Sequence, residues 1–223
     1  MEQQHSPTSE LVFADQWNVA DLRTFIARAR AAEDGAVRLQ AAGSVLAAYI
    51  CILRPRILGE ATPTVLGLRT MPLNAPARVD TTVALASVSD RLARMAEDEV
   101  VLQIPPTTVT ESWAGVLPPR SGWESQGDLD ASVVETAARD GIREVAETVP
   151  NNPGALIVNS ARGAIWGRSI EGLPVDVPAG AAFGAFALGF LAKGERPAIF
   201  TNGRWTRIST SRGHVLSRIP TVL

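Results

Sequence analysis

The chain has 223 residues, of which 46% are hydrophobic and 20% are charged, and its formal net charge at neutral pH is -2. This hydrophobic content excludes a disordered chain, and the small net charge excludes an overall electrostatic attraction to nucleic acid or to an anionic membrane. Because the chain has one cysteine, it cannot form an internal disulfide or a metal site built from several cysteines.

The first residues have the composition of a tail. The stretch from Met1 to Glu10 is polar and acidic, whereas a secretory signal needs a basic start followed by an apolar run. We therefore expect a disordered tail over residues 1–15, a single domain over residues 16–223, and a cytoplasmic protein.

The first half of the chain predicts a helix followed by strands. Apolar residues recur at helical spacing from Leu22 to Ala29, which predicts an amphipathic helix that ends at Gly35. Separate short strands are predicted for the apolar runs 37–41, 45–53, 65–73 and 81–85. A short helix from Ser87 to Met95 and a strand over 100–104 follow.

The second half predicts helices and then hairpins. Asp128 is expected to cap a helix that ends at Pro150, and residues 152–168 fit either a helix or a hairpin. Asn202-Gly203 is a strong hairpin signal between strands 198–201 and 205–210, and a third strand follows over 215–219. The expected fold class is α+β, with a mostly antiparallel sheet packed against several helices and with C-terminal β-hairpins.

One segment, residues 177–192, carries no charge and contains several glycines. It is shorter than the roughly 20 residues that a membrane-spanning helix needs. We expect a helix that is buried by the rest of the domain or by a second subunit. The second alternative predicts self-association as a homo-oligomer, and no membrane partner is expected.

Residues suited to catalysis are few. His5 lies in the expected tail, so His214 is the one histidine in a predicted folded element. The sequence has neither a Gly-x-Ser-x-Gly elbow nor a phosphate-binding glycine loop. We therefore assign no catalytic residue and predict no metal and no cofactor.

A long segment between residues 105 and 127 holds the first candidate ligand site. Trp113 and Trp123 lie on either side of Arg120, which follows two prolines. Aromatic planes beside a guanidinium could form a pocket wall for a small anionic ligand. Alternatively, the tryptophans anchor the loop on the core, and this second interpretation is the one we favour.

The C-terminal strands hold the second candidate site. From Lys193 onward there are six basic residues and one acid. Trp205 and Arg207 share one strand face by alternation, and Arg212 and His214 lie at the adjoining turn. Such a face could stack a base and bind phosphate, but charged residues also protect exposed strands from aggregation, which is the interpretation we favour. The candidate ligand-binding residues are Trp113, Arg120, Trp123, Arg207, Arg212 and His214.

The pattern GRWTRISTSRGHVL at 203–216, taken with Trp113–Glu124, Ala179–Leu191 and Thr64–Arg69, resembles a family of actinobacterial proteins that has no assigned activity. The resemblance covers most of the chain after the tail. It implies a cytoplasmic bacterial protein, and it implies no cofactor and no role for any residue.

These observations together predict a soluble, non-catalytic protein that works through protein–protein association. A first alternative is a small-molecule-binding protein or an enzyme that acts on an anionic ligand near the Trp113–Trp123 loop. A second alternative is nucleic-acid binding through the basic C-terminal strands. We rank it last and do not expect nucleic acid as a partner, because no known nucleic-acid motif accompanies the charge.

Overall fold

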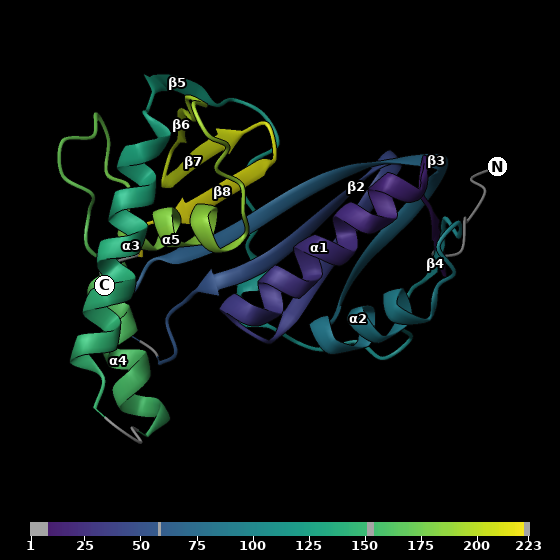
Figure 1. Cartoon of the computed structure of the whole chain (residues 1–223), viewed down its shortest axis with the longest axis horizontal. Helices are drawn as coiled ribbons and strands as arrows, with labels where there is room; N and C mark the ends of the chain where they lie inside the picture. Colours follow the sequence, from purple (N-terminus) through teal and green to yellow (C-terminus); the bar gives the residue numbers. More distant parts are fainter. Residues whose placement is uncertain (1–8, 58, 151–153, 221–223) are drawn as a thin grey trace. The chain divides into compact units, whose positions relative to one another are not determined.

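The computed structural model describes residues 9–57, 59–150 and 154–220 (Figure 1). Contacts within the chain divide it into two compact units. Unit 1 comprises Met1–Ile50 and Arg69–Gly115, and unit 2 comprises Cys51–Leu68 and Val116–Leu223. Two long strands have residues in both units, because β2 spans Ala36–Leu53 and β3 spans Thr64–Ala84.

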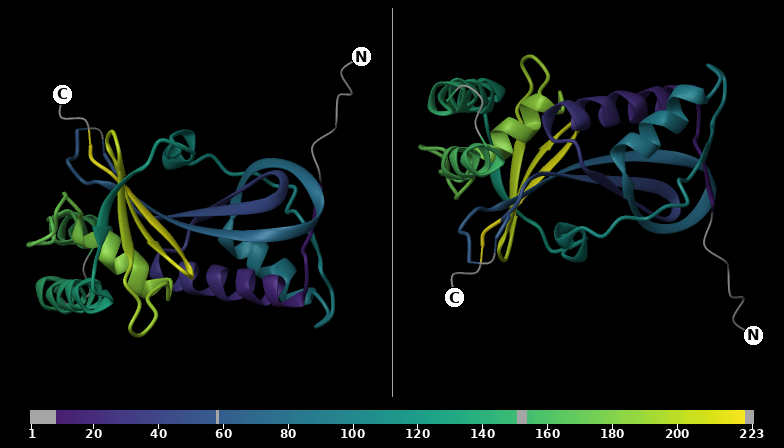
Figure 2. Two further views of the ribbon diagram at one scale, coloured as in Figure 1. Left: turned by 90° about the horizontal axis from the view of Figure 1, so that it is seen from above. Right: turned by 90° about the horizontal axis from the view of Figure 1, so that it is seen from below.

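Unit 1 places two helices on one side of β2 and β3 (Figure 2). Its other elements are β1 (Glu10–Val12), α1 (Gln16–Ala32), α2 (Leu85–Arg94), β4 (Val101–Gln103) and a 3-10 helix, η1 (Ser112–Gly115). The Asp15 carboxylate caps α1 by accepting the Asn18 N–H at 2.9 Å. Arg23 of α1 donates a hydrogen bond to the carbonyl of Leu92 in α2 at 2.9 Å, and this bond adds to the apolar packing between the two helices.

Residues 10–12 are strand, although they lie in the segment that we expected to be a disordered tail. Leu11 pairs with Leu102 in an antiparallel β1–β4 ladder, and Leu11 is fully buried. A buried leucine with a ladder partner gives these residues a fixed place. The rest of the expected tail includes residues 1–8, which lie outside the described residues.

The four short strands predicted in the first half of the chain belong to two continuous strands, β2 and β3. Gly43, with φ of 101°, lies inside β2 and lets the strand bend where we expected it to end. In β3, exposed and buried residues alternate from Met71 to Asp80, and Pro72 and Pro76 are both exposed. The prolines therefore interrupt the apolar pattern without ending the strand.

Unit 2 contains an antiparallel meander and three helices. Its elements are β5 (Glu124–Asp128), α3 (Ala131–Thr148), α4 (Ala155–Trp166), α5 (Ala179–Ala187), β6 (Ala198–Asn202), β7 (Trp205–Thr210) and β8 (Gly213–Arg218). Asn202 pairs with Trp205, so the predicted hairpin is confirmed, with Gly203 at φ of 56° in its turn. The alternative that was left open for 152–168 is settled as helix over Ala155–Trp166.

The larger sheet has six strands in the order β2-β3-β8-β7-β6-β5. The pairings β3–β8, β8–β7, β7–β6 and β6–β5 are all antiparallel. Together with the five helices of the described residues, this sheet confirms the predicted α+β class.

The uncharged segment 177–192 is covered by its own unit. None of its residues is exposed, and only Ala179–Ala187 is helical. A Cβ on Gly184 would lie 3.4 Å from Val215 and 3.5 Å from Ile52, which are ordinary contact distances, so α5 packs against β8 at this position. This burial removes the reason for expecting a second subunit on the segment. Among the described residues, no helix is both long and apolar enough to cross a membrane.

A second glycine shapes the packing of the unit 2 helices. Gly141 of α3 faces Trp166 of α4, and a Cβ at Gly141 would lie only 2.2 Å from the indole. The indole is 3% exposed and stacks on Phe183 of α5, with ring centroids 4.6 Å apart. Glycine lowers the helix propensity of α3 at this position, but it leaves room for the Trp166 indole of α4, which contacts both α3 and α5.

Candidate functional site

Two of the predicted ligand-binding residues, Trp123 and Arg207, contact each other. The Arg207 guanidinium carbon lies 4.5 Å from the Trp123 ring centroid and 4.4 Å from that of Phe200. Burial lowers the pKa of Arg207, and its buried Nε has no hydrogen-bond partner among the described residues. The partly buried guanidinium therefore lies against two aromatic faces, which attract a cation through their ring electrons.

The loop that precedes Trp123 is held on the β6–β7 hairpin. Trp123 Nε1 donates to the carbonyl of Pro119 at 2.9 Å. Asn202 Nδ2 donates to the carbonyls of Ser121 and Gly122 at 2.8 and 2.9 Å. These bonds and the Trp123–Arg207 stack support the anchored-loop interpretation for this part of the segment.

The other candidate residues have separate surroundings. Trp113 belongs to η1 in unit 1 and is 4% exposed, whereas Arg120 belongs to unit 2 and is exposed. Arg212 is exposed in the β7–β8 turn, and His214 Nδ1 lies 3.0 Å from the Ser209 hydroxyl. Ligand binding by these residues stays a prediction.

Trp205, the aromatic residue considered for stacking a base, is not available for stacking. Trp205 is 6% exposed and belongs to the core of unit 2. A base needs an open aromatic face, so this burial weakens the alternative of nucleic-acid binding through β7.

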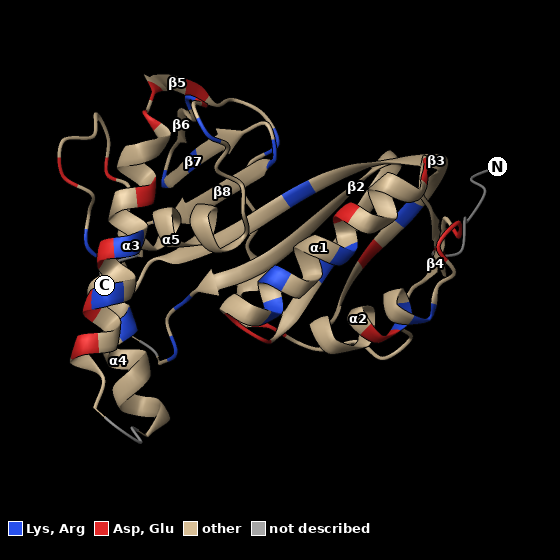
Figure 3. Ribbon diagram, viewed as in Figure 1, with Lys and Arg blue, Asp and Glu red and all other residues tan. Residues whose placement is uncertain are grey.

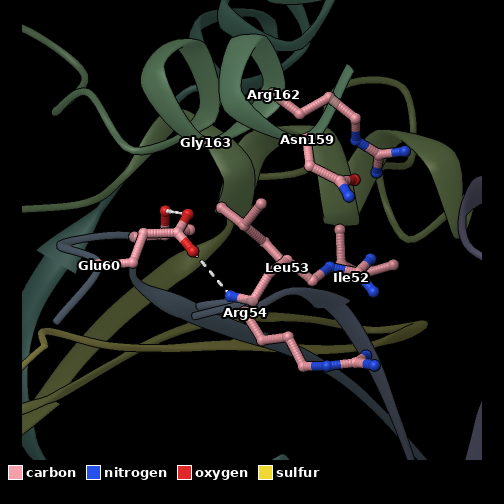
Figure 4. A pocket seen from close by; sticks show the side chains of 9 residues that line it. Ile52, Leu53, Arg54, Glu60, Asn159, Arg162 and Gly163 are labelled. Atoms are coloured by element: carbon pink, nitrogen blue, oxygen red, sulfur yellow. Dashed lines mark hydrogen bonds between the residues drawn. The ribbon is translucent and has the colours of Figure 1, made fainter. Parts of the chain in front are cut away.

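Unit 2 contains a groove that the sequence analysis missed. It lies between α4 and the connection from β2 to β3, and its volume is about 500 Å³. It is lined by Arg56, Ile57, Glu60, Ala61, Thr62, Leu156, Asn159, Ser160, Gly163, Ala164, Gly167 and Arg168. A smaller pocket of about 10 Å³ shares several of these residues and adds Ile52, Leu53, Arg54 and Arg162 (Figure 4).

Glu60 organises one wall of the groove. Its Oε2 accepts the N–H groups of Arg56 and Ile57 at 2.7 and 3.4 Å, and its Oε1 accepts the Thr62 hydroxyl. Burial raises the pKa of Glu60, but these hydrogen bonds outweigh burial and hold the pKa below its ordinary value. The carboxylate is therefore ionised at neutral pH and already has three donors.

Gly163 lets α4 approach this wall. A Cβ at Gly163 would lie 2.9 Å from Thr62 Oγ1 and 3.2 Å from Glu60 Oε1. In the sequence, the hairpin alternative for residues 152–168 would place Gly163 in a turn, and no pattern identified Glu60. No local pattern joins residues that are about a hundred positions apart, which is why the groove was not predicted.

Arginines outnumber acids around the groove and the small pocket. Of the residues that the structure describes, four arginines and one acid, Glu60, line them; the arginines are Arg54, Arg56, Arg162 and Arg168. Arg168 also pairs with Glu144 of α3 at 2.7 Å. Within the described part of the chain, no group of three or more acidic, histidine or cysteine residues is placed to hold a metal ion.

Two family models match the chain, one for each half. Residues 6–115 match a Domain of unknown function (DUF8010), and residues 118–222 match a Domain of unknown function (DUF8185). The boundary between the matches coincides with the passage from unit 1 to unit 2 at Gly115. Both matches agree with the expected resemblance to a family without an assigned activity, and neither bears on an actinobacterial origin. No curated protein matches the chain.

Solved structures with a similar fold include bacterial sliding clamps. A protein of Eubacterium rectale assigned as a DNA polymerase III beta subunit has a TM-score of 0.54 at 9% identity, and the match covers 95% of this chain and 65% of that one. The Caulobacter crescentus DNA polymerase sliding clamp has a TM-score of 0.53 at 12% identity, with coverage of 95% and 65%. The Bartonella birtlesii DnaN sliding clamp has a TM-score of 0.53 at 11% identity, with coverage of 94% and 64%. At these identities the likeness is one of fold, and the chain spans about two thirds of the length of each clamp.

Proposed function

We propose that this protein is a non-catalytic subunit that associates with copies of itself into a sliding-clamp-like assembly acting on DNA. The observation that supports the proposal is the likeness to clamp folds over 94–95% of the chain. The chain is shorter than those clamps, so the number of copies in an assembly has to be measured.

The edges of the six-stranded sheet differ in their capacity for self-association. The edge strand β5 has five residues, two acidic side chains and a bulge between Ser125 and Gly127, all of which discourage pairing. The opposite edge strand, β2, has 18 residues, and Arg38 is its one charged residue. A long apolar edge offers backbone groups to another strand, so we propose β2 as the edge at which copies associate.

Val45→Lys is expected to weaken self-association at least 10-fold. Val45 lies in β2 with 54% of its surface exposed, and a lysine there would place a charge at the proposed contact. Light scattering after size exclusion over a concentration series measures the effect. Val133→Lys on α3, where the valine is 40% exposed, is the matched control. A wild-type protein that is monomeric at every concentration would contradict the proposal.

The helices of unit 1 support contact with DNA. Helices α1 and α2 carry two acids, Asp21 and Asp90, against five arginines, and blue segments follow α1 in Figure 3. The arginines are Arg23, Arg28, Arg30, Arg91 and Arg94. Arginine side chains bind phosphates and release counterions, so a locally basic helix pair compensates for the negative charge of the whole chain. The expectation that nucleic acid is not a partner rested on the lack of a known nucleic-acid motif, and the fold lends it no support.

The double variant Arg28→Ala/Arg94→Ala is expected to weaken DNA binding and to reduce the salt dependence of log K by roughly 2, about 0.9 for each lost phosphate contact. Binding to a nicked circular plasmid and to its linearised form gives the measurement, and a clamp-like assembly should be lost faster from the linear form. Arg139→Ala/Arg143→Ala on α3 is the control, since that helix carries four acids against these two arginines. Equal loss with both double variants would contradict a specific role of α1 and α2.

A further inference from the structure

The groove between α4 and the β2–β3 connection has aliphatic side chains on both walls. Ile57 on the connection is 68% exposed, and Leu156 on α4 is 76% exposed. Ala61 and Ala164 also line the groove. Aliphatic side chains of this size, exposed around a concave surface of about 500 Å³, are typical of a binding site.

The polar groups of the groove favour an anionic occupant. Four arginines face one carboxylate around the groove and the adjoining small pocket. Glu60 keeps its negative charge beside Arg56, and Arg168 also pairs with Glu144, but the lining still holds more arginines than carboxylates. Figure 4 shows Asn159 projecting from α4 toward Ile52 near the end of β2, with the Arg162 side chain beside it.

The walls are also held in place before any ligand binds. The Glu60 hydrogen bonds fix the connection, and Gly163 lets α4 lie against Thr62 and Glu60. A groove that is already formed loses little conformational entropy when it is occupied.

We infer that this groove binds an acidic peptide segment of a partner protein, with an aliphatic side chain of the peptide between Ile57 and Leu156 and its carboxylates toward Arg56 and Arg162. A small inorganic anion would leave Ile57 and Leu156 in water. Nucleic acid is disfavoured because, among the described residues, no aromatic side chain on which a base could stack lines the groove. A peptide matches both the apolar walls and the positive charge.

The probe is a fluorescein-labelled peptide Asp-Glu-Leu-Leu-Glu-Asp, measured by fluorescence anisotropy with the full chain. Leu156→Asp and Arg56→Glu are each expected to weaken its binding at least 10-fold. The matched controls are Ile142→Asp, where the isoleucine is 39% exposed on α3, and Arg143→Glu on the same helix. Both controls should bind the probe within about 2-fold of wild type. The four substitutions are at solvent-accessible positions, and circular dichroism checks that each variant is folded.

Four comparison probes distinguish the possible occupants of the groove. A peptide with serines in place of the leucines should bind at least 10-fold more weakly, and a peptide with lysines in place of the acids should not bind. Displacement of the acidic peptide by millimolar inorganic phosphate would indicate a small-anion site and overturn the inference. Binding of a DNA duplex that Leu156→Asp and Arg56→Glu abolish, without peptide binding, would also overturn it, as would no peptide binding up to 1 mM.

This inference is independent of self-association. Val45→Lys should bind the peptide as wild type does, because Val45 is not among the lining residues. A monomeric protein that binds the peptide would therefore contradict the proposed assembly and leave the groove assignment standing.

Discussion

Gly141→Leu is expected to lower the free energy of unfolding by about 3 kcal/mol, the upper end of the cost of overpacking a core. Even a Cβ at this position would lie 2.2 Å from the Trp166 indole, which is buried and stacked on Phe183. Alanine or leucine would improve the helix propensity of α3 by at most about 1 kcal/mol. The steric conflict is therefore larger than the gain, and the indole has to leave its stacked position.

Urea denaturation measures this loss. Gly115→Ala is the control, because a Cβ at Gly115 has no neighbour within 4 Å. Trp166→Ala alone should also destabilise the protein, but in the double variant with Gly141→Leu the two losses should be less than additive, because the leucine can enter the space that the indole leaves. Additive losses would show that the two positions do not share a contact.

Asp80→Ala is expected to destabilise the protein by about 2 kcal/mol. Arg38 of β2 donates from Nε and Nη2 to the two Asp80 oxygens at 2.7 and 2.8 Å, and also donates to the carbonyl of Ala114. The hydrogen bond to Asp80 raises the pKa of Arg38, whose side chain is only 16% exposed. Without Asp80, the largely buried Arg38 cation loses its counter-ion. Because Asp80 itself is 48% exposed, we expect a smaller loss of stability than the 3–5 kcal/mol that is typical of breaking a fully buried pair.

Two measurements test the Arg38–Asp80 pair. Urea denaturation gives the stability, and Arg38→Met/Asp80→Ala should recover part of the loss because it removes the unpaired charge. Amide hydrogen exchange in η1 should rise in Asp80→Ala, since the Arg38 bond to Ala114 depends on the orientation that Asp80 imposes. An exposed pair, Arg143–Asp140 on α3, provides the control, and Asp140→Ala should change stability by less than about 0.5 kcal/mol.

The same two variants test whether residues 16–223 behave as the single domain that we predicted. Gly141 belongs to unit 2 and Asp80 to unit 1, while β2 and β3 each have residues in both units. A strand shared by two units loses its ladder partners when either unit unfolds, so we expect one cooperative transition that both substitutions shift. Two transitions, each shifted by one substitution, would contradict the single domain.

The sequence by itself determined α1, α2 and α3, the C-terminal hairpins and the α+β class. These features depend on neighbours along the chain: the spacing of Leu22 to Ala29 defines α1, Asp15 and Asp130 accept the N–H groups of Asn18 and Ser132 at the starts of α1 and α3, and Gly203 supplies the turn between β6 and β7. The helix caps lie within a few residues of the positions expected from pattern alone.

Only the tertiary structure decided how the candidate sites are built. Asn202 holds Ser121 across 81 positions of sequence, Arg207 stacks on Trp123, and Gly163 meets Glu60 and Thr62. Periodicity and capping report the local conformation of the backbone, whereas these contacts arise when separate elements pack and a small residue leaves room for a distant one. Sequence patterns therefore identified Trp123 and Arg207 as two separate candidates, and packing showed that they form one cluster. The groove at α4 could be recognised only in the folded chain.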